Sequence, residues 1–257
     1  MNRPRLILLG TGTGLPDLDR GHTHMLWDGP GGPLLIDAGG STYERLLRAG
    51  IDPQNLAGLI LTHSHCDHLN GLPALIFSMR LAGRELPLSI YGLESTLSIA
   101  RATIDAMQVE YYTPPMWHPL EAGDTLPLAG GWQLRTALTA HSRPCLALRF
   151  EAPTGDPALV YSADTEPCPA VQALAQAANL LVHEATTADR FTGHSSPLQA
   201  GQVAAEAGAK RLVLVHYSPR WTMSEDRALA AVRAGGFHGP AEIGRDGQVV
   251  AIDGWGY

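Results

Sequence analysis

The sequence predicts a single α/β domain over residues 1–257, built as a four-layer αββα sandwich of two packed sheets with helices outside. Three observations support this prediction. The length suits one large domain, and no long linker, low-complexity tract or short repeat divides the chain. Short Leu-rich or β-branched runs alternate with turn signals, as strands do. Hairpin-like strands come first, strands interleaved with helices follow, and this order occurs in two successive stretches.

The expected strands are apolar runs bounded by Gly, Pro or polar residues. They cover residues 6–9, 25–27, 34–36, 59–61, 88–91, 132–138, 145–150, 159–161, 180–182, 212–215 and 248–252. The expected helices cover residues 43–48, 72–81, 95–107, 170–178, 197–207 and 224–234. Ser95 and Ser224 are residue types that cap helix N-termini, and Pro197 after Ser196 suits a first helical turn.

The composition indicates a globular protein, with 45% hydrophobic and 17% charged residues. A net charge of −7 without Lys/Arg-rich blocks argues against a general polyanion-binding surface. Cys66, Cys145 and Cys168 are odd in number and lack C-x-x-C spacing, which excludes a disulfide scaffold and is typical of a reducing cytosol. The apolar run at residues 6–9 is too short for a signal peptide, and no window approaches ~18 apolar residues. We therefore expect a cytoplasmic protein with no membrane association.

The chain contains an unusually large number of histidines, eleven. Shortly after the apolar run 59–61, four potential metal ligands lie within six residues. They are His63, His65, Asp67 and His68, in the pattern H-x-H-x-D-H. Such a run arises by chance in about one in a thousand sequences of this composition. In an extended loop, residues two apart point the same way, so His63 and His65 can bind one ion while Asp67 and His68 turn toward a second. The alternative is a polar surface loop of fortuitous histidines.

Four ligands cannot complete two metal sites, so other strand ends should supply more. His141 follows the expected strand 132–138, Asp164 follows 159–161, and His216 ends 212–215. Each of them, taken alone, suits a hydrogen-bonded residue at a strand end. Their common position after apolar runs favours metal ligation, and a carboxylate such as that of Asp164 can bridge two cations.

Further segments are spread over nearly the whole chain. They are 9–12 (LGTG), 36–39 (IDAG), 162–165 (SADT), 183–186 (HEAT), 193–196 (GHSS) and 215–221 (VHYSPRW). Together with the H-x-H-x-D-H core, they resemble the metallo-β-lactamase superfamily and, within it, the ribonuclease Z-like branch. The resemblance implies the αββα fold and two metal sites bridged by Asp164. It implies that one metal is bound by His63, His65 and His141, and the other by Asp67, His68 and His216.

The resemblance also implies hydrolysis by a hydroxide bound between two divalent ions, Zn²⁺ or Mn²⁺. Asp67 would orient the attacking water. His194 is the candidate general acid, and its alternative role is a loop histidine ahead of the helix that follows. His183 and Glu184 end an apolar strand, and we expect a buried pair that orients a metal ligand, with Glu184 also a candidate catalytic residue.

Substrate-binding candidates come from the S-x-R ending that follows His216. Arg220 can clamp a phosphoryl oxygen with its planar guanidinium, and Ser218 belongs to the same segment. Arg220 can equally be a plain surface residue. The apolar and aromatic segment 107–117, which includes Tyr111 and Tyr112, can wall a substrate pocket or serve as core or dimer contact.

The chain departs from ribonuclease Z in one respect. That family typically carries a long Gly/Pro-rich arm that grips tRNA, inserted between the positions that match His141 and Asp164. Here these residues are 23 positions apart, and two expected strands and a turn fill the interval. An acidic chain without the arm offers few phosphate contacts. We therefore expect a small anionic ester as substrate, first of all a phosphodiester; tRNA 3′-end processing and arylsulfatase- or lactonase-like hydrolysis are the alternatives.

Two other classes of function remain open at this point. Superfamily members that bind iron carry out redox chemistry, but the flavodiiron type resembles H-x-E-x-D-H, where this chain has His65. A metal-stabilised scaffold without turnover would not need the complete ligand set. About two zinc or manganese ions per chain would favour hydrolysis. We also expect a homodimer, since dimers are common among similar proteins.

Overall fold

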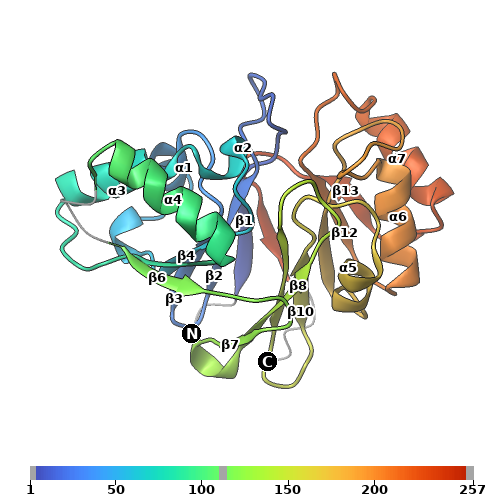
Figure 1. Ribbon diagram of the computed structural model, residues 1–257. Coiled ribbons are helices and arrows are strands. Elements are labelled where there is room, and N and C mark those ends of the chain that lie inside the picture. Colours follow the sequence, from blue (N-terminus) through green and yellow to red (C-terminus); the bar gives the residue numbers. More distant parts are fainter. Residues whose placement is uncertain (1–3, 110–114, 253–257) are drawn as a thin grey trace.

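Two mixed β-sheets pack face to face in the computed structural model, which describes residues 4–109 and 115–252, and helices cover both outer faces (Figure 1). The first half of the chain and its last strand form one sheet. Its strands are β1 (Arg5–Gly10), β2 (His24–Gly29), β3 (Gly32–Ile36), β4 (Gly58–Leu61), β5 (Ser89–Gly92), β6 (Met116–Pro119) and β14 (Val249–Ala251). They lie in the order β14-β1-β2-β3-β4-β5-β6, antiparallel from β14 to β3 and parallel from β3 to β6.

The second half of the chain forms the other sheet. Its strands are β7 (Thr125–Pro127), β8 (Gln133–Leu138), β9 (Leu146–Glu151), β10 (Ala158–Tyr161), β11 (Leu180–Glu184), β12 (Leu212–Val215) and β13 (Ala241–Ile243). The order is β13-β12-β11-β10-β9-β8-β7, antiparallel from β7 to β10 and parallel from β10 to β13. Parallel neighbours need long crossover connections, which the helices supply.

The helices are divided between the two outer faces (Figure 1). The first sheet is covered by α1 (Thr42–Arg48), α3 (Leu72–Leu81) and α4 (Glu94–Ala106), and the second by α5 (Pro169–Leu174), α6 (Pro197–Glu206) and α7 (Glu225–Ala234). The short elements are α2 (Cys66–Leu69) and two 3-10 turns, Pro53–Asn55 and Ala129–Gly131. Helix α6 begins as predicted, because Ser196 and Gln199 form a reciprocal capping box.

Alternation along the strands sorts apolar side chains into a central core between the sheets and two outer cores beneath the helices. In β2, Trp27 faces the other sheet and Leu26 faces the helices. Trp27 stacks on Phe150 of β9 with ring centroids 5.2 Å apart, and its centroid is 5.6 Å from that of Trp132. Burying a side chain of this kind contributes roughly 1.5–3 kcal/mol. This packing fixes the two sheets relative to each other.

The architecture confirms the predicted fold class, but several element predictions were wrong. Strands β6, β7 and β13 were not expected: β7 and β13 have three residues each, too few for alternation to be visible, and β6 ends in a proline. Segment 66–69, expected as a loop, is helix α2. Ser95 does not cap α4, which begins at Glu94 after Leu93.

Two further expectations concern the cysteines and membranes. All three cysteines fall within the described residues and are free. Across residues 4–109 and 115–252, no helix is long and apolar enough to cross a bilayer.

Candidate metal centre

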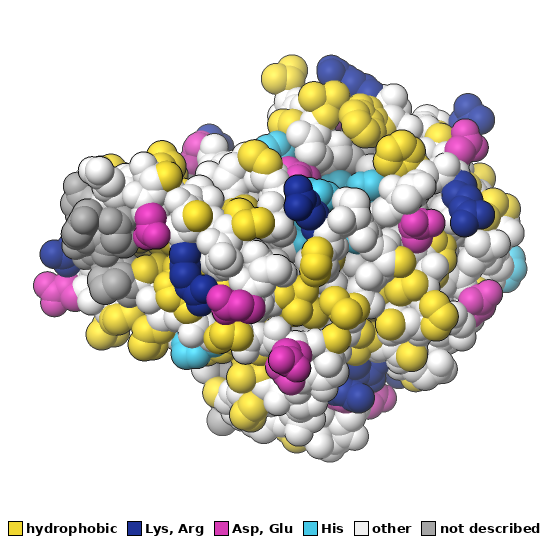
Figure 2. All heavy atoms as spheres, viewed as in Figure 1, with side chains coloured by type: hydrophobic (Ala, Val, Ile, Leu, Met, Phe, Trp, Pro, Cys, Tyr) yellow, Lys and Arg dark blue, Asp and Glu magenta, His cyan; other side chains and the backbone are white. Residues whose placement is uncertain are grey.

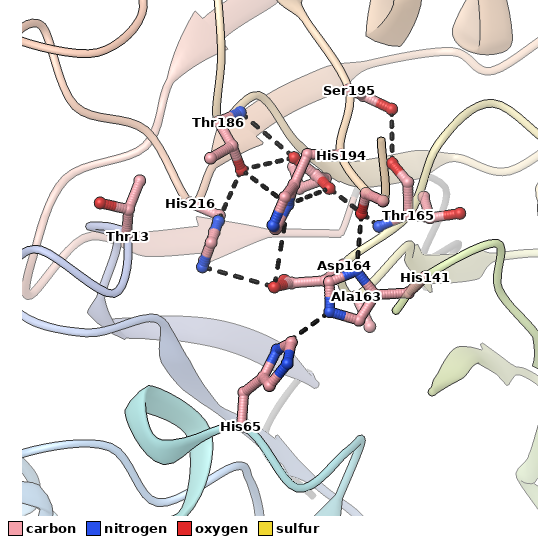
Figure 3. Close-up of polar contacts among 12 residues, drawn as sticks. Thr13, His65, His141, Ala163, Asp164, Thr165, Thr186, His194, Ser195 and His216 are labelled. Carbon is pink, nitrogen blue, oxygen red and sulfur yellow. Dashed lines mark hydrogen bonds and ion pairs between the residues drawn. The ribbon is translucent and has the colours of Figure 1, made fainter. Parts of the chain in front are cut away.

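The seven side chains expected as metal ligands lie together at one edge of the sandwich, where strand ends of both sheets meet. Figure 3 shows four of them, His65, His141, Asp164 and His216. The first sheet contributes the side chains that follow β4 or lie in α2: His63, His65, Asp67 and His68. The second sheet contributes the side chains that follow β8, β10 and β12: His141, Asp164 and His216. A local motif is thus completed by residues about 80 to 150 positions away in the chain.

One group of potential ligands contains His63, His65, His141 and Asp164. His65 Nδ1 lies 3.1 Å from His63 Nε2 and 3.0 Å from His141 Nε2. Asp164 Oδ2 lies 3.7 Å from His63 Nε2. Because ligand atoms about 2.1 Å from a tetrahedral cation are about 3.4 Å apart, this spacing suits one metal ion.

A second group contains Asp67, His68 and His216. Asp67 Oδ2 lies 3.5 Å from His68 Nε2 and 3.3 Å from His216 Nε2. Asp164 Oδ2 lies 3.6 Å from the same nitrogen of His68 and 3.5 Å from that of His216. One carboxylate therefore borders both groups, which is the arrangement that a bridging ligand needs.

Two buried atoms in these groups support the presence of cations. Asp164 Oδ1 and His68 Nε2 have no hydrogen-bond partner among the described residues. Leaving a buried polar atom unsatisfied costs about 1–3 kcal/mol. Burial acts to raise the pKa of Asp164, but His216 and His68 lower it well below its ordinary value, so the carboxylate is ionised. The donor set and its unsatisfied atoms fit divalent cations.

Asp37, at the end of β3, supports the ligands of the first sheet. His68 Nδ1 donates to Asp37 Oδ2 at 2.8 Å, which directs Nε2 into the cluster. His63 Nδ1 lies 3.0 Å from the hydroxyl of Thr62, and this hydroxyl donates to Asp37 Oδ2 at 2.8 Å. Asp37 lies in the segment 36–39 that resembles the family, but no role was predicted for it. The available signal is an acidic residue directly after a buried strand that neighbours the motif.

Glu184, at the end of β11, supports the second sheet in the same way. Its carboxylate accepts the hydroxyl of Thr186 at 2.6 Å and the backbone N–H of Thr165 at 2.8 Å. Thr186 Oγ1 in turn lies 2.6 Å from His216 Nδ1. His194 Nδ1 donates to Glu184 Oε1 at 2.9 Å. Glu184 is fully buried. It holds His194 directly and holds His216, a metal-ligand candidate, through the hydroxyl of Thr186.

His194 borders the second ligand group and forms, with Asp164 and His216, a third set of side chains that could hold an ion. Its ring stacks on that of His216 with centroids 5.5 Å apart, and its Nδ1 lies 4.0 Å from Asp164 Oδ2. Burial acts to lower the pKa of His194, but the hydrogen bond and charge of Glu184 raise it above its ordinary value. Glu184 therefore favours the protonated form of this imidazole.

Three turns at the site have backbone conformations that side chains other than glycine rarely adopt. Asp37, Ala163 and His216 have φ values of 60°, 49° and 49°. Each follows a buried strand, and the left-handed residue turns the chain sharply at the edge where the ligands gather. Such conformations cost about 1–3 kcal/mol each and persist where surrounding contacts enforce them.

A pocket of about 280 Å³ opens onto the cluster. Its lining contains side chains of the centre and of two loops: Thr13, Leu15, His65, Asp67, Asp164, Thr186, His194, His216 and Trp221, with the backbone of Gly14. Figure 2 shows histidine side chains at the surface in a hollow between the two halves of the molecule. A larger hollow of about 540 Å³ beneath α5, lined by Arg135 and Arg149, contains none of the potential ligands.

Comparison with known proteins identifies the family. Residues 33–217 match the model of the "Beta-lactamase superfamily domain". The chain belongs to the metallo-β-lactamase superfamily. It is 30% identical to Ribonuclease Z of Methanothermobacter thermautotrophicus, over 84% of this chain and 87% of that protein. It is also 30% identical to Ribonuclease BN of Cronobacter sakazakii, over 88% of this chain and 93% of the relative.

A solved structure has the same superfamily fold. The metallo-β-lactamase fold protein YhfI of Bacillus subtilis matches with a TM-score of 0.81 and 25% identity, covering 96% of this chain and 99% of that one. The resemblance found in the sequence, a metallo-β-lactamase hydrolase of the ribonuclease Z-like branch, is thereby confirmed. This chain is thus a hydrolase of the superfamily, and its His/Asp clusters can bind metal.

The relatives named Ribonuclease Z are longer than this chain in the matched region. The alignment with the M. thermautotrophicus protein spans 272 positions, but 84% of 257 residues is only about 216, so about 56 positions have no counterpart here. Between His141 and Asp164, where the sequence analysis expected no arm, the chain forms β9 and β10 and the turn between them.

Several candidate residues lie outside the pocket. Ser218 is buried in a turn, where its carbonyl accepts the backbone N–H groups of Trp221 and Thr222. Arg220 is exposed, and neither residue lines the pocket that the described residues form. The expected pairing of His183 with a carboxylate is wrong, because its Nδ1 donates to the backbone carbonyl of Glu184 at 2.8 Å. Consecutive residues of a strand point to opposite faces, so only Glu184 reaches the centre.

The expected pocket wall at residues 107–117 does not appear in the described part of that segment. Met107 and Met116 are exposed, and neither lines the pocket at the metal centre. Tyr111 and Tyr112 lie outside the described residues. The walls come instead from the loops that carry Leu15 and Trp221, which the sequence analysis did not select.

Proposed function

We propose that this metallo-β-lactamase hydrolase is a dinuclear phosphodiesterase that cleaves small phosphodiesters, with Zn²⁺ as its resident ions. The observation that carries the proposal is the shared carboxylate of Asp164, which lies within 3.7 Å of nitrogens from both ligand groups and has an unsatisfied second oxygen. The imidazole-rich donor set suits Zn²⁺ better than Mn²⁺, which prefers oxygen ligands.

The proposed ligands divide as the two groups do. His63, His65 and His141 would hold one ion, and Asp67, His68 and His216 the other, with Asp164 shared. When bound, two divalent cations supply Lewis acidity at the phosphoryl oxygens and lower the pKa of water toward neutrality.

Asp67 is proposed to orient the attacking water, and His194 to protonate the leaving oxygen. Burial acts to raise the pKa of Asp67, but the hydrogen bond from His216 lowers it, so the carboxylate stays ionised and can accept a hydrogen bond from the attacking water. The attacking water gives up one proton to bulk solvent, and its oxygen forms a bond to phosphorus as the bond to the leaving oxygen breaks. Glu184 holds Nδ1 of His194, which leaves Nε2 to donate its proton to the departing alkoxide. Glu184 is therefore a positioning residue, not a catalytic one.

Pocket size and chain length favour a small substrate. A pocket of about 280 Å³ accommodates the phosphate and one of the two ester substituents of a small phosphodiester. The acidic chain lacks about 56 positions of its ribonuclease Z relative, and bound cations make the centre locally positive within a protein of net charge −7. These features favour a small anion over a long polyanion spread across the surface.

The test is a panel of substrates on zinc-loaded protein: bis(4-nitrophenyl) phosphate, 4-nitrophenyl sulfate, a lactone and a precursor tRNA. We expect turnover of the phosphate diester, with the sulfate and the lactone poor substrates. Faster turnover of the sulfate or the lactone would contradict the proposal. Zinc content of about two ions per chain, measured by mass spectrometry, accompanies the panel.

Ribonuclease Z-type cleavage of tRNA precursors is the second candidate, favoured by the names of relatives 30% identical over most of the chain. It uses the same centre and differs in how the substrate is held. Cleavage of the precursor at nanomolar enzyme concentration, with slow turnover of small diesters, would establish it.

The free cysteines support a reducing compartment such as the cytoplasm. The homodimer stays a prediction, which sedimentation analysis checks.

A further inference from the structure

Two large apolar side chains stand exposed at the mouth of the metal pocket. Leu15 is 50% exposed and Trp221 is 49% exposed, and both line the pocket whose floor contains Asp67, Asp164 and His216. They belong to two loops that rise from the edge of the sandwich above the centre, one after β1 and the other after β12 (Figure 1). Figure 2 shows hydrophobic side chains grouped on the surface just above the histidines.

Both side chains are presented by structured backbone. The N–H of Leu15 lies 3.2 Å from the hydroxyl of Thr13, which is buried. The N–H of Trp221 donates to the carbonyl of Ser218 at 3.0 Å. The next residue, Thr222, is buried and its hydroxyl donates to the carbonyls of Ala185 and Thr186 at 3.1 and 2.9 Å. These anchors hold exposed apolar groups over a polar floor, a combination typical of ligand sites.

We propose that Leu15 and Trp221 form an apolar mouth that binds a flat aromatic group attached to the phosphodiester. This inference rests on the proposed function and names the substrate class of the same centre. A charged or fully hydrated substituent would gain nothing from these side chains. An aromatic ring covers apolar surface and stacks on the indole, while the phosphate reaches the ligand cluster at the floor. The ring can belong to an aryl group or to a nucleobase.

Substrates with one leaving group and different second substituents test the mouth. We choose methyl, phenyl and thymidine 5′ esters of 4-nitrophenyl phosphate, all of which release 4-nitrophenolate. For the zinc-loaded protein we expect KM for the phenyl or thymidine ester to be about tenfold below KM for the methyl ester, by comparison with aromatic stacking on bases. The lower of the two values identifies an aryl or a nucleoside substrate. Because 4-nitrophenyl is itself aromatic and common to all three esters, equal KM values for the three, together with equal affinities for phenylphosphonate and methylphosphonate, would overturn the proposal.

Four variants separate the mouth from general damage. Trp221→Ala and Leu15→Ala should raise KM for the preferred aromatic ester to near that of the methyl ester, and should raise KM for the methyl ester much less. Trp221→Phe, which keeps a ring, should restore most of the preference. Leu86→Ala removes a side chain that is 74% exposed elsewhere and should leave all three substrates unchanged. A Trp221→Ala protein that loses activity equally on the methyl and aromatic esters would contradict the role of the mouth.

A binding measurement keeps this inference separate from the proposed function. Calorimetry with phenylphosphonate and methylphosphonate on the zinc-loaded protein reports the mouth without turnover. We expect phenylphosphonate to bind about tenfold more tightly, and Trp221→Ala to remove the difference. If no diester is hydrolysed but the difference in affinity is present, the proposed function fails and the mouth stands. If diesters are hydrolysed and the two phosphonates bind equally, the mouth fails and the function stands.

Discussion

The pKa values of the histidines at the centre are shifted in different directions because their neighbours differ. Burial lowers the pKa of His63 and His65, which suits neutral metal ligands. For His194 burial acts in the same direction, but Glu184 outweighs it and raises the pKa. Among the ligand candidates His68 differs, because burial acts to lower its pKa but Asp164 and Asp37 raise it well above its ordinary value. One residue type thus supplies both ligand candidates and a candidate proton donor at one centre.

Replacing His194 should reveal its role through the leaving group. His194→Ala should slow a diester with a phenolate leaving group by roughly 100-fold or more, because that oxygen needs a proton as it departs. A diester that releases 4-nitrophenolate should slow far less. Steady-state rates on the two esters test this, and equal losses on both would exclude a general acid at this position.

The pH dependence of stability offers a second test of His194. Its pKa is raised in the folded protein, so proton binding by the pair with Glu184 stabilises the fold fully below the unfolded pKa of about 6.5. That contribution is lost as pH rises through the raised pKa. In urea unfolding of the metal-free protein, His194→Ala should therefore cost more stability at pH 6 than at pH 9. A cost that is the same at both pH values would contradict the ion pair.

At the scale of elements, strand ends carry the chemistry and buried carboxylates organise it. Asp37 directly follows β3 and Glu184 is the last residue of β11, and each holds one histidine directly and another through a threonine hydroxyl. The two sheets therefore support the centre with matching arrangements. Gly39, just after β3, allows α2 to approach, since a Cβ at this position would lie 2.0 Å from the carbonyl oxygen of Asp67.

Loss of the Asp37 carboxylate should weaken metal binding without removing a ligand. Asp37→Asn should reduce zinc affinity by about 10- to 100-fold, because His68 and Thr62 lose the carboxylate that orients them. Competition with a fluorescent zinc chelator measures this. Asp105→Asn, at an exposed position on α4, is the matched control and should bind zinc as the unmodified protein does. Unchanged affinity in Asp37→Asn would contradict the supporting role.

For the whole molecule, the centre joins the two sheets. Each ligand group combines side chains from both sheets, so metal binding should stabilise the folded sandwich and not just a loop. The large core between the sheets holds the ligand groups in register without the metal, and the strained turns at Asp37, Ala163 and His216 depend on that framework.

Metal removal should lower the melting temperature. Free zinc at about 100 times Kd contributes ~2.7 kcal/mol to the folded state. In a domain of this size that raises Tm by roughly 5–10 °C. Differential scanning fluorimetry with chelator and with added zinc measures the shift. Asp164→Ala, which removes the shared carboxylate, should abolish both the shift and hydrolysis, and a retained shift would exclude Asp164 as a ligand.

Patterns that are local in the chain were readable from the sequence. The four residues of H-x-H-x-D-H are adjacent, and the apolar runs before His141, Asp164 and His216 are strands in the structure. Three short or edge strands escaped prediction, because three or four residues carry too little periodicity. The fold class followed from the order of the longer elements.

Residue types and their spacing were enough to indicate the family, the αββα sandwich and the side chains that can bind metal. Which of these groups contact one another depends on how the chain folds. Glu184 was expected to pair with its neighbour His183, but strand geometry separates the two and folding brings His194 to it. Leu15 and Trp221, about 200 positions apart, meet at one pocket for the same reason: contacts between distant segments follow from how the two sheets pack.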